Sequence, residues 1–364
     1  MLRLISTLAA AGLLASCAVP PPYAGYQLLV RQLAVYRDIA AKGGWKPLPA
    51  GKAIRPGVSD RRVPALRARL QVEDASVPGA VPAQAELYDP ALVEAVKAFQ
   101  RRHGLMDDGE VGKPTLAALN APASRRVEQI MANLERWRWL PDELPEDRVD
   151  VNVAAAVAVL MKDGKPALSM KAAAGRKTDH TPMLASQIAS IVLNPPWNIP
   201  REIAQTEIYP KMRADPAYAV REQIRVIKTS DGGERLQQVA GPKSSLGQIK
   251  FDFDNRYGVY LHDTPAKEAF DKQRRMVSHG CVRLENPKGL AQLLLQGQQS
   301  PEQIQQAIDT GRTARVRLAK PTAVYLFYWT ALVGPDGKMY FYQDPYDWDH
   351  ELLQKLLKQK DGSA

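Results

Sequence analysis

Apolar residues in the first part of the chain recur at the spacing of a helix. Between residues 26 and 42 they follow one another mostly three and four residues apart, at Leu28, Leu29, Leu33, Val35, Tyr36 and Ile39. Side chains at this spacing gather on one face of a helix, and the glycines at 43–44 suit a helix end. The pattern predicts an amphipathic helix over 26–42 and another that begins near Val63.

The stretch "YDPALVEAVKAFQRRHGLMDDGEVGKPTLAALN", residues 88–120, predicts two more helices. Asp89 can cap the first of them, with Pro90 at its first position, and Gly104 ends it. Its apolar face consists of Leu92, Val93, Val96 and Phe99. A turn at "DDG" leads to a short helix over 113–120, and residues 125–147 predict one further helix, stopped by Pro141.

After residue 148 the pattern changes to short apolar runs separated by turns, which is typical of strands. Two runs flank "DGKP" at 163–166, and a third leads into the proline-rich loop "NPPWNIP". Helical spacing returns over about 201–220, and a hairpin follows over 224–242.

The last third of the chain continues this mixed pattern. A strand over 257–264 runs into His262, and a helix follows the cysteine at 281. A hairpin over 322–346 turns at "PDG" and precedes a final helix over 349–360. The expected fold class is α+β and multidomain: helical units come first, and a mainly β unit with a mixed sheet or sandwich follows.

The composition adds a positive charge to this picture. Lys and Arg outnumber Asp and Glu by 49 to 39, which gives a formal net charge of +10. Such a charge favours polyanionic partners, namely nucleic acid, acidic lipid or acidic cell-wall polymer. The sequence contains no recognisable nucleic-acid motif and no long run of Lys or Arg, so we expect no nucleic-acid partner.

The first residues, "MLRLISTLAAAGLLASCAVPPP", have the layout of an export signal, with Arg3, an apolar stretch to Leu14 and small residues before Cys17. A buried core helix is the alternative. "LASC" resembles the lipobox of bacterial lipoproteins. That resemblance implies a cleaved signal over 1–16, lipid on Cys17 and a periplasmic protein anchored to a membrane, with Ala18 favouring the outer one. No other apolar run approaches the roughly 18 residues of a membrane span.

The cysteine count then draws attention to Cys281. The chain has two cysteines, so if Cys17 carries lipid, Cys281 has no disulfide partner within the chain. An unpaired thiol in an oxidising compartment is either buried and inert or used. Cys281 lies two residues after His279 and nineteen after His262.

These neighbouring histidines favour a thiol that acts as a catalytic nucleophile. A cysteine attacks as thiolate, and a histidine within hydrogen-bond reach can take its proton. The strand before His262 would hold that imidazole in place. Backbone N–H groups at Gly280 and Cys281 could stabilise an oxyanion. In an extended segment Arg283 would lie on the same side as the thiol.

Three other interpretations stay open on these residues. Arg283 could simply pair with Asp263 or Glu285. His, Asp and Cys are also zinc ligands, but no third and fourth ligands lie at the usual spacing, so we expect no metal. A serine nucleophile at Ser278 lacks the G-x-S-x-G setting.

Two longer stretches carry a family resemblance. "SHGCVR" at 278–283, preceded by "YLHDTP" at 260–265, resembles the active-site signature of the L,D-transpeptidases, the YkuD-type cysteine enzymes of bacterial cell-wall synthesis. Similar pieces lie upstream: "GRKTDHTPML", "NPPWNIP" and "GPKSSLGQIKF". One departure is Ser244, where asparagine is expected, and it puts a substrate-loop contact in doubt. Residues 88–120 resemble a peptidoglycan-binding three-helix module, which points to the large, scaffold-bearing subgroup of the family.

The resemblance implies a role for each matching residue. Cys281 is the nucleophile and His262 the general base, while His279 and Ser278 shape the site. Gly280 and Cys281 offer backbone donors to the oxyanion. The residues implied to bind substrate or to line or support its cleft are Arg283, Trp197, Asn194 and Tyr260.

The implied reaction is a two-step acyl transfer without metal or organic cofactor. Cys281 attacks the diaminopimelate carbonyl of a tetrapeptide stem and releases D-alanine, and the thioester then passes to a neighbouring stem amine to give a 3→3 crosslink. Water, a free D-amino acid or a protein lysine could be the acceptor instead. A chain that only tethers the wall, through lipid at one end and helices at the other, is the alternative from a different class. Peptidoglycan and a membrane are the expected partners.

We therefore expect the following division of the chain: a lipoprotein signal at 1–16, an anchor linker with a scaffold helix at 17–60, a peptidoglycan-binding-like module at 61–122, a connecting helix at 123–148, a catalytic domain at 149–322 with a capping insertion at about 199–244, and a C-terminal hairpin and helix at 323–364.

Overall fold

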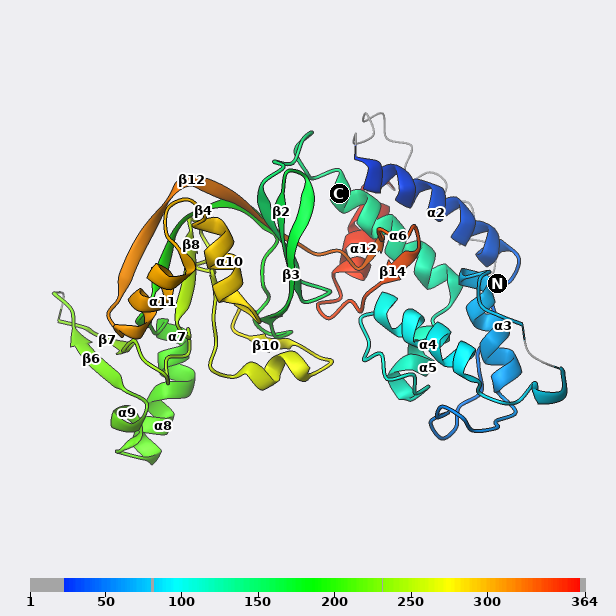
Figure 1. Ribbon diagram of the computed structural model, residues 1–364, viewed down its shortest axis with the longest axis horizontal. Coiled ribbons are helices and arrows are strands. Elements are labelled where there is room, and N and C mark those ends of the chain that lie inside the picture. Colours follow the sequence, from blue (N-terminus) through cyan, green and yellow to red (C-terminus); the bar gives the residue numbers. More distant parts are fainter. Residues whose placement is uncertain (1–22, 80–81, 231, 361–364) are drawn as a thin grey trace. The chain divides into compact units, whose positions relative to one another are not determined.

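The computed structural model describes residues 23–79, 82–230 and 232–360 (Figure 1). They form two compact units. The sheet unit comprises residues Pro145–Tyr328, and the helical unit comprises the described residues up to Leu144 together with those from Trp329 onward. The expected α+β class, with helices ahead of a mixed sheet, is confirmed. The expected signal and Cys17 lie outside the described residues.

A nine-stranded mixed sheet organises the sheet unit, in the order β10-β3-β11-β9-β8-β4-β12-β1-β2, and β3 also pairs with β2. Its strands are β1 (Arg148–Asn152), β2 (Val157–Lys162), β3 (Lys165–Gly175), β4 (Leu184–Leu193), β8 (Ile249–Phe253), β9 (Leu261–His262), β10 (Met276–Ser278), β11 (Val282–Leu284) and β12 (Ala314–Phe327). The expected hairpin around "DGKP" is present as β2 and β3. Helices α10 (Pro287–Leu294) and α11 (Pro301–Asp309) follow β11.

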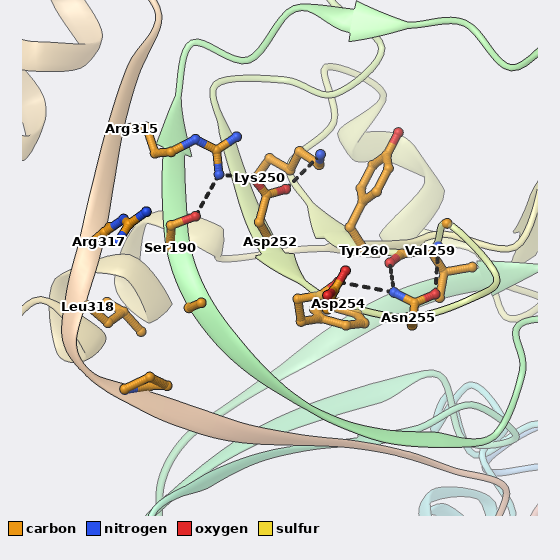
Figure 2. A pocket seen from close by; sticks show the side chains of 14 residues that line it. Ser190, Lys250, Asp252, Asp254, Asn255, Val259, Tyr260, Arg315, Arg317 and Leu318 are labelled. Atoms are coloured by element: carbon orange, nitrogen blue, oxygen red, sulfur yellow. Dashed lines mark hydrogen bonds and ion pairs between the residues drawn. The ribbon is translucent and has the colours of Figure 1, made fainter.

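Cross-strand polar contacts line one part of this sheet. Arg315 of β12 donates to Ser190 of β4 at 2.7 Å and to Asp252 of β8 at 2.5 Å (Figure 2). The three strands are consecutive in the sheet, so these contacts follow from its order. They lie beside the strand that ends at His262.

The insertion between β4 and β8 forms its own small core. It contains β5 (Trp197–Asn198), α7 (Arg201–Ile203), a π-helical turn (Ala204–Ile208), α8 (Tyr209–Ala214), α9 (Tyr218–Arg221), β6 (Ile224–Lys228) and β7 (Glu234–Gln238). The last two strands form the expected hairpin, and helices and hairpin lie together at one end of the unit in Figure 1. Ile199, Ala204, Ile208 and Leu236 are its buried residues. The insertion is therefore a structured element rather than a long loop.

Helices with two buried apolar clusters make up the helical unit. Its elements are α2 (Ala24–Ala41), α3 (Val63–Glu73), a 3-10 turn (Pro82–Gln84), α4 (Pro90–Arg102), α5 (Lys113–Leu119), α6 (Ala123–Trp137), β13 (Ala331–Val333), β14 (Met339–Phe341) and α12 (Trp348–Lys360). Asp89 caps α4 as expected, because its side chain accepts from the backbone N–H of Leu92. One cluster lies within residues 48–119, and the other joins α2 and α6 to the C-terminal elements.

Two boundaries expected from the sequence are wrong. The connecting helix expected over 123–148 ends at Trp137, ahead of the stop expected at Pro141, which has no N–H to continue the ladder and restricts the residue before it. The boundary at 322/323 falls inside β12, which runs to Phe327 because its residues 323–327 pair in register with β1. Only the part from Trp329 onward joins the helical unit.

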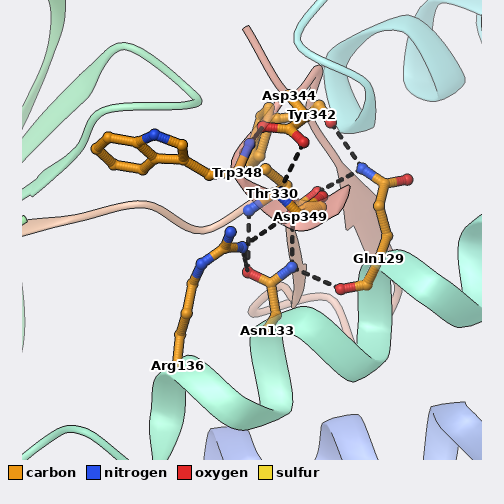
Figure 3. Close-up of polar contacts among 8 residues, drawn as sticks. All are labelled: Gln129, Asn133, Arg136, Thr330, Tyr342, Asp344, Trp348 and Asp349. Carbon is orange, nitrogen blue, oxygen red and sulfur yellow. Dashed lines mark hydrogen bonds and ion pairs between the residues drawn. The ribbon is translucent and has the colours of Figure 1, made fainter. Parts of the chain in front are cut away.

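A buried polar network holds α12 against α6 (Figure 3). Arg136 of α6 donates to Asp349 of α12 at 2.5 Å, and the two side chains are 1% and 0% exposed. Thr330 donates its hydroxyl to the same carboxylate at 2.7 Å, and Asn133 donates to that hydroxyl at 2.7 Å. Because buried charges are costly unless they are paired, this network determines how the C-terminal segment packs.

No helix in the described part of the chain combines the length and the apolar character needed to cross a bilayer.

The network predicts an unequal response to two aspartate substitutions. Asp349→Ala leaves Arg136 buried without its charge partner and should destabilise the helical unit by about 3–5 kcal/mol. Asp38→Ala removes an exposed pair with Lys42 on α2 and should cost less than about 1 kcal/mol. Hydrogen exchange of the α6 amides measures both. Equal losses of protection would contradict this role of the network.

Candidate active site

Strand register brings the candidate residues onto one face of the sheet. In the parallel pair β9–β11, Val282 lies opposite Leu261 and Arg283 opposite His262. Opposed residues share a face, and residues two apart on a strand share it as well. His262 and Arg283 therefore share a face. Tyr260 and Cys281 join them there, because the Tyr260 ring packs against the imidazole and Tyr260 is hydrogen-bonded to the thiol.

His262 is buried and has a defined hydrogen-bond partner. Its Nδ1 faces the backbone carbonyl of Asp263. A carbonyl oxygen only accepts, so Nδ1 carries the proton and Nε2 is left as the basic nitrogen. Burial lowers the pKa of His262 to about 3, with the nearby Arg283 cation as the next cause. The imidazole is therefore neutral at physiological pH and able to accept a proton.

The segment after His262 is held from both sides. The Asp263 carboxylate accepts from the Gln248 N–H at 2.8 Å and from Lys267 at 2.7 Å. A Cβ on Gly247, whose φ is +59°, would lie 2.4 Å from the same carboxylate. Only glycine fits there, and the close approach keeps the carbonyl of residue 263 in place for the imidazole.

Cys281 is a partly exposed free thiol. Burial raises its pKa, while hydrogen bonds from the backbone and side chain of Tyr260 and the charges of Lys250 and Arg283 act in the opposite direction. The thiol is therefore protonated at neutral pH in the unliganded protein. In the described residues no hydrogen bond joins it to His262, so both members of the pair rest in their neutral forms.

Tyr260 connects the thiol to its surroundings. Its ring packs edge-on against His262 at 5.6 Å between centroids, and the Lys250 Nζ lies 4.1 Å from the ring centroid. Burial raises the pKa of the Tyr260 hydroxyl, the Cys281 charge and hydrogen bond raise it further, and a hydrogen bond with Trp197 lowers it. Tyr260 thus lies between the nucleophile, the base and the insertion.

The turn that carries Cys281 is stabilised by its own polar groups. The Ser278 hydroxyl donates to the Cys281 carbonyl at 2.5 Å and accepts from the Gly280 N–H at 3.2 Å. Gly280 has a φ of +108°, a conformation that glycine adopts readily. Thr181, which the sequence analysis did not single out although it lies within "GRKTDHTPML", donates to the Gly280 carbonyl at 2.7 Å.

The same turn bears on the expected oxyanion donors. In the unliganded protein the Gly280 N–H donates to the Ser278 hydroxyl at 3.2 Å. The oxyanion role implied for Gly280 stays a prediction, and it requires this hydrogen bond to be exchanged for one to the substrate.

His279 contacts the insertion instead of the thiol. Its Nε2 lies 2.6 Å from the Glu207 carboxylate on the π-helical turn, and Arg176 reaches the same carboxylate at 3.5 Å and also pairs with Asp179. The His279 hydrogen bond lowers the pKa of Glu207. No local pattern in the chain pointed to Glu207, because this pair joins residues 72 positions apart.

Arg283 keeps a donor available. The alternative partners of Arg283 are otherwise engaged, since Asp263 pairs with Lys267 and Glu285 with Lys171. The Arg283 Nε is buried and makes no hydrogen bond within the described residues. Such a group costs free energy unless a ligand satisfies it.

Asn194 supports the cleft from behind. Its side-chain amide donates to the carbonyls of Ala307, Ile308 and Arg312, so it holds the end of α11 in place. Because this amide is engaged with the backbone, the contact fits a supporting role and does not fit direct binding of substrate. Ser244, the departure noted in the sequence, is fully buried and bonds the Pro195 carbonyl at 3.4 Å.

Among the described residues no three His, Cys, Asp or Glu side chains gather closely enough to hold a metal ion. The site contains the Cys281 thiol, a neutral imidazole whose unprotonated nitrogen is Nε2, and two cations, Lys250 and Arg283. Those groups suit nucleophilic attack on a carbonyl carbon.

Comparisons with known proteins find similar sequences for both parts of the chain. Residues 146–313 match the family model of the L,D-transpeptidase catalytic domain (YkuD), and residues 60–119 match that of a putative peptidoglycan binding domain. A curated protein of Haemophilus influenzae (strain ATCC 51907 / DSM 11121 / KW20 / Rd), described as a putative L,D-transpeptidase, is 27% identical over 246 residues, which are 63% of this chain and 50% of that protein. The chain thus matches half the length of this relative.

Two solved structures are also similar in part. The catalytic domain from an E. faecium L,D-transpeptidase acylated by ertapenem is 16% identical and covers 51% of this chain and 99% of its own, with a TM-score of 0.24. An L,D-transpeptidase from Stackebrandtia nassauensis is 15% identical and covers 78% of this chain and 97% of its own, with a TM-score of 0.28.

The neutral resting state of the thiol and imidazole predicts the pH dependence of alkylation. Because the pKa of Cys281 is raised above its ordinary value of 9.0, the rate of reaction with iodoacetamide should rise steadily up to and beyond pH 9. Tyr260→Phe removes a hydrogen bond to the thiolate, which should slow alkylation about tenfold at a fixed pH. Tyr257→Phe, at an exposed tyrosine nearby, is the control. A rate plateau below pH 7 would mean a preformed thiolate–imidazolium pair and would refute this state.

Proposed function

Since residues 146–313 match the family model of the L,D-transpeptidase (YkuD) catalytic domain and residues 60–119 that of a putative peptidoglycan binding domain, we propose that this protein remodels peptidoglycan by acyl transfer through a thioester on Cys281. The donor is a tetrapeptide stem that loses its terminal D-alanine, and the acceptor is the side-chain amine of a second stem, which gives a 3→3 crosslink. The observation that carries the proposal is the common face shared by Cys281, His262, Tyr260 and Arg283.

The first step moves one proton and one acyl group. The Cys281 sulfur attacks the diaminopimelate carbonyl while His262 Nε2 takes the thiol proton. The C–N bond then breaks, the proton passes to the leaving amine, and D-alanine departs. Because the thiol and imidazole are neutral at rest, this proton transfer accompanies the attack on substrate and does not precede it.

Two donors are available for the developing oxyanion. The Cys281 N–H makes no hydrogen bond within the described residues, and the Tyr260 hydroxyl lies beside the sulfur. Both would stabilise negative charge on the carbonyl oxygen. The unpartnered Nε of Arg283 suits a carboxylate of the stem peptide.

The insertion at about 199–244 is proposed to cap the site. Glu207 of this insertion lies next to His279, and Trp197, on the strand β5 that leads into it, lies next to Tyr260. Through these two contacts it can position the thiol-bearing turn. Hydrolysis of the thioester, D-amino-acid exchange or transfer to a protein lysine would use the same acyl-enzyme with another acceptor.

The remaining parts of the proposal concern location. A domain pair of this kind acts on the cell wall, outside the cytoplasm. Binding of glycan by the helical module and attachment of lipid at Cys17, with an outer-membrane address, rest on sequence resemblance.

Removal of the nucleophile tests the reaction. Cys281→Ala should lower formation of the acyl-enzyme by at least about 1000-fold, with little effect on stability because one small side chain replaces another. The measurement is mass spectrometry of the intact protein, and of digested sacculi, after incubation with tetrapeptide-rich peptidoglycan. Persistent crosslinking by the variant would refute the assignment. An unchanged mass of the folded wild type, also after exposure to a carbapenem, would favour the tethering alternative.

The anchor is tested separately. Cys17→Ala should release the protein from the membrane fraction of cells that express the full chain. Activity of the purified protein should stay within about twofold of wild type, since no described catalytic residue changes. Retention of the variant in the membrane fraction would rule out the lipid as the anchor.

A further inference from the structure

A groove of about 900 Å³ lies on the sheet unit next to Tyr260 (Figure 2). Its walls come from β4, β8, β12 and the loop before β9, and no residue of the insertion at 199–244 lines it. Apolar side chains, among them Val259, Leu318 and Pro321, contribute to the lining alongside several charged ones. Tyr260 and Lys250 are the lining residues that the proposed attack on the donor already uses.

Strand register places the groove on the catalytic face of the sheet. His262 lies opposite Lys250, Lys250 opposite Val192, and Val192 opposite Arg315. One step along, Asp252 lies opposite Ser190, and Ser190 opposite Arg317. Opposed residues share a face. One face of the sheet therefore carries these side chains from the imidazole to β12, and all of them except Val192 are polar.

The charges in this groove do not balance. Asp252 accepts from Lys250 at 2.7 Å and from Arg315 at 2.5 Å, so one carboxylate serves two cations. Arg317 points into the same groove, and its guanidinium makes no hydrogen bond or ion pair within the described residues. Asp254 also lines the groove, so three cations there face two carboxylates. No ion pair within the described residues joins Arg317 to either carboxylate, and a ligand carboxylate is the group that fits its guanidinium in a bidentate manner.

The insertion contacts the thiol-bearing turn on the flank away from the groove, and it also reaches Tyr260, at the edge of the groove, through Trp197. The contact of the insertion with His279 and Arg176 lies at β10 and β3, which are the end of the sheet order beyond β11. The groove lies beyond β9, over β8, β4 and β12. A reaction between two peptides at one sulfur needs two approaches, and the sheet has one on each side of Cys281.

We propose that this groove is the acceptor subsite, which holds a peptide bearing a carboxylate and a free amine. The carboxylate binds Arg317, and the amine reaches the thioester past Tyr260. This inference rests on the proposed function and names the place of its second substrate. The acceptor enters after the donor has been attached, so it needs the side that the insertion does not line.

The step that this subsite serves is balanced. The acceptor amine attacks the thioester carbonyl, a C–N bond forms, and the C–S bond breaks. One amine proton passes by way of His262 Nε2 to the departing sulfur and restores the thiol. No oxidant, reductant or cofactor takes part.

The two half-reactions separate the groove from the donor site. In the full chain, Arg317→Ala should leave the rate of D-alanine release and acyl-enzyme formation within about twofold of wild type in a single turnover without acceptor. The KM for an amine-bearing acceptor tripeptide should rise about tenfold or more, and dimer formation at low acceptor should fall accordingly, as expected for loss of a charge-assisted hydrogen bond. Arg317→Lys should restore part of the loss. Arg312→Ala, which removes an exposed arginine just before β12 that does not line the groove, is the matched control.

Each outcome is informative. Equal slowing of D-alanine release and crosslinking by Arg317→Ala would assign the groove to the donor and overturn the inference, as would an unchanged acceptor KM. If the wild type released D-alanine but formed no crosslinked peptide dimer, water would be the acceptor. That result would refute the acceptor subsite but would leave the proposed acyl-enzyme intact. Absence of both D-alanine release and acyl-enzyme in the wild type would refute the proposed function itself.

Discussion

The hydrogen bond from His262 Nδ1 to the Asp263 carbonyl is the constraint on which the site depends. It fixes the tautomer, so the basic nitrogen is Nε2, and it does so inside a buried setting that lowers the imidazole pKa to about 3. A charged imidazole is excluded at rest. The carbonyl itself stays in place because Gly247 admits the Asp263 side chain at close range and Gln248 and Lys267 bind it.

Burial acts on the thiol in the opposite sense. It raises the pKa of Cys281 while it lowers that of His262, so each group is held in its neutral form. The pair is consequently unreactive until a carbonyl arrives and makes proton transfer favourable. Tyr260 and Arg283 are already positioned to stabilise the charge that then develops. Such a thiol is better protected from oxidation than a standing thiolate, because the thiolate is the reactive form.

The mixed sheet accounts for the two-sided approach to the sulfur. The parallel pairing of β9 with β11 puts the thiol-bearing turn next to the histidine strand, and the antiparallel run through β8, β4 and β12 extends the same face toward Arg317. The insertion contacts the other flank through Glu207. In the helical unit, the buried Arg136–Asp349 pair binds the end of the chain to α6, so residues far apart in sequence form one core there.

Local features of this protein followed from the sequence alone: the helix capped by Asp89, the hairpin at "DGKP", and the S-H-G-C turn with His262 upstream. These depend on interactions between residues close in the chain, such as caps, turn conformations and the spacing of apolar residues. The tertiary structure decided what depends on register and burial: the use of the Gly280 amide by Ser278, the role of Asn194 behind the cleft, the Glu207–His279 contact, the end of β12 and the groove at Arg317. Pairing between distant strands sets these contacts, and no local pattern in the chain specifies which residues will be opposed.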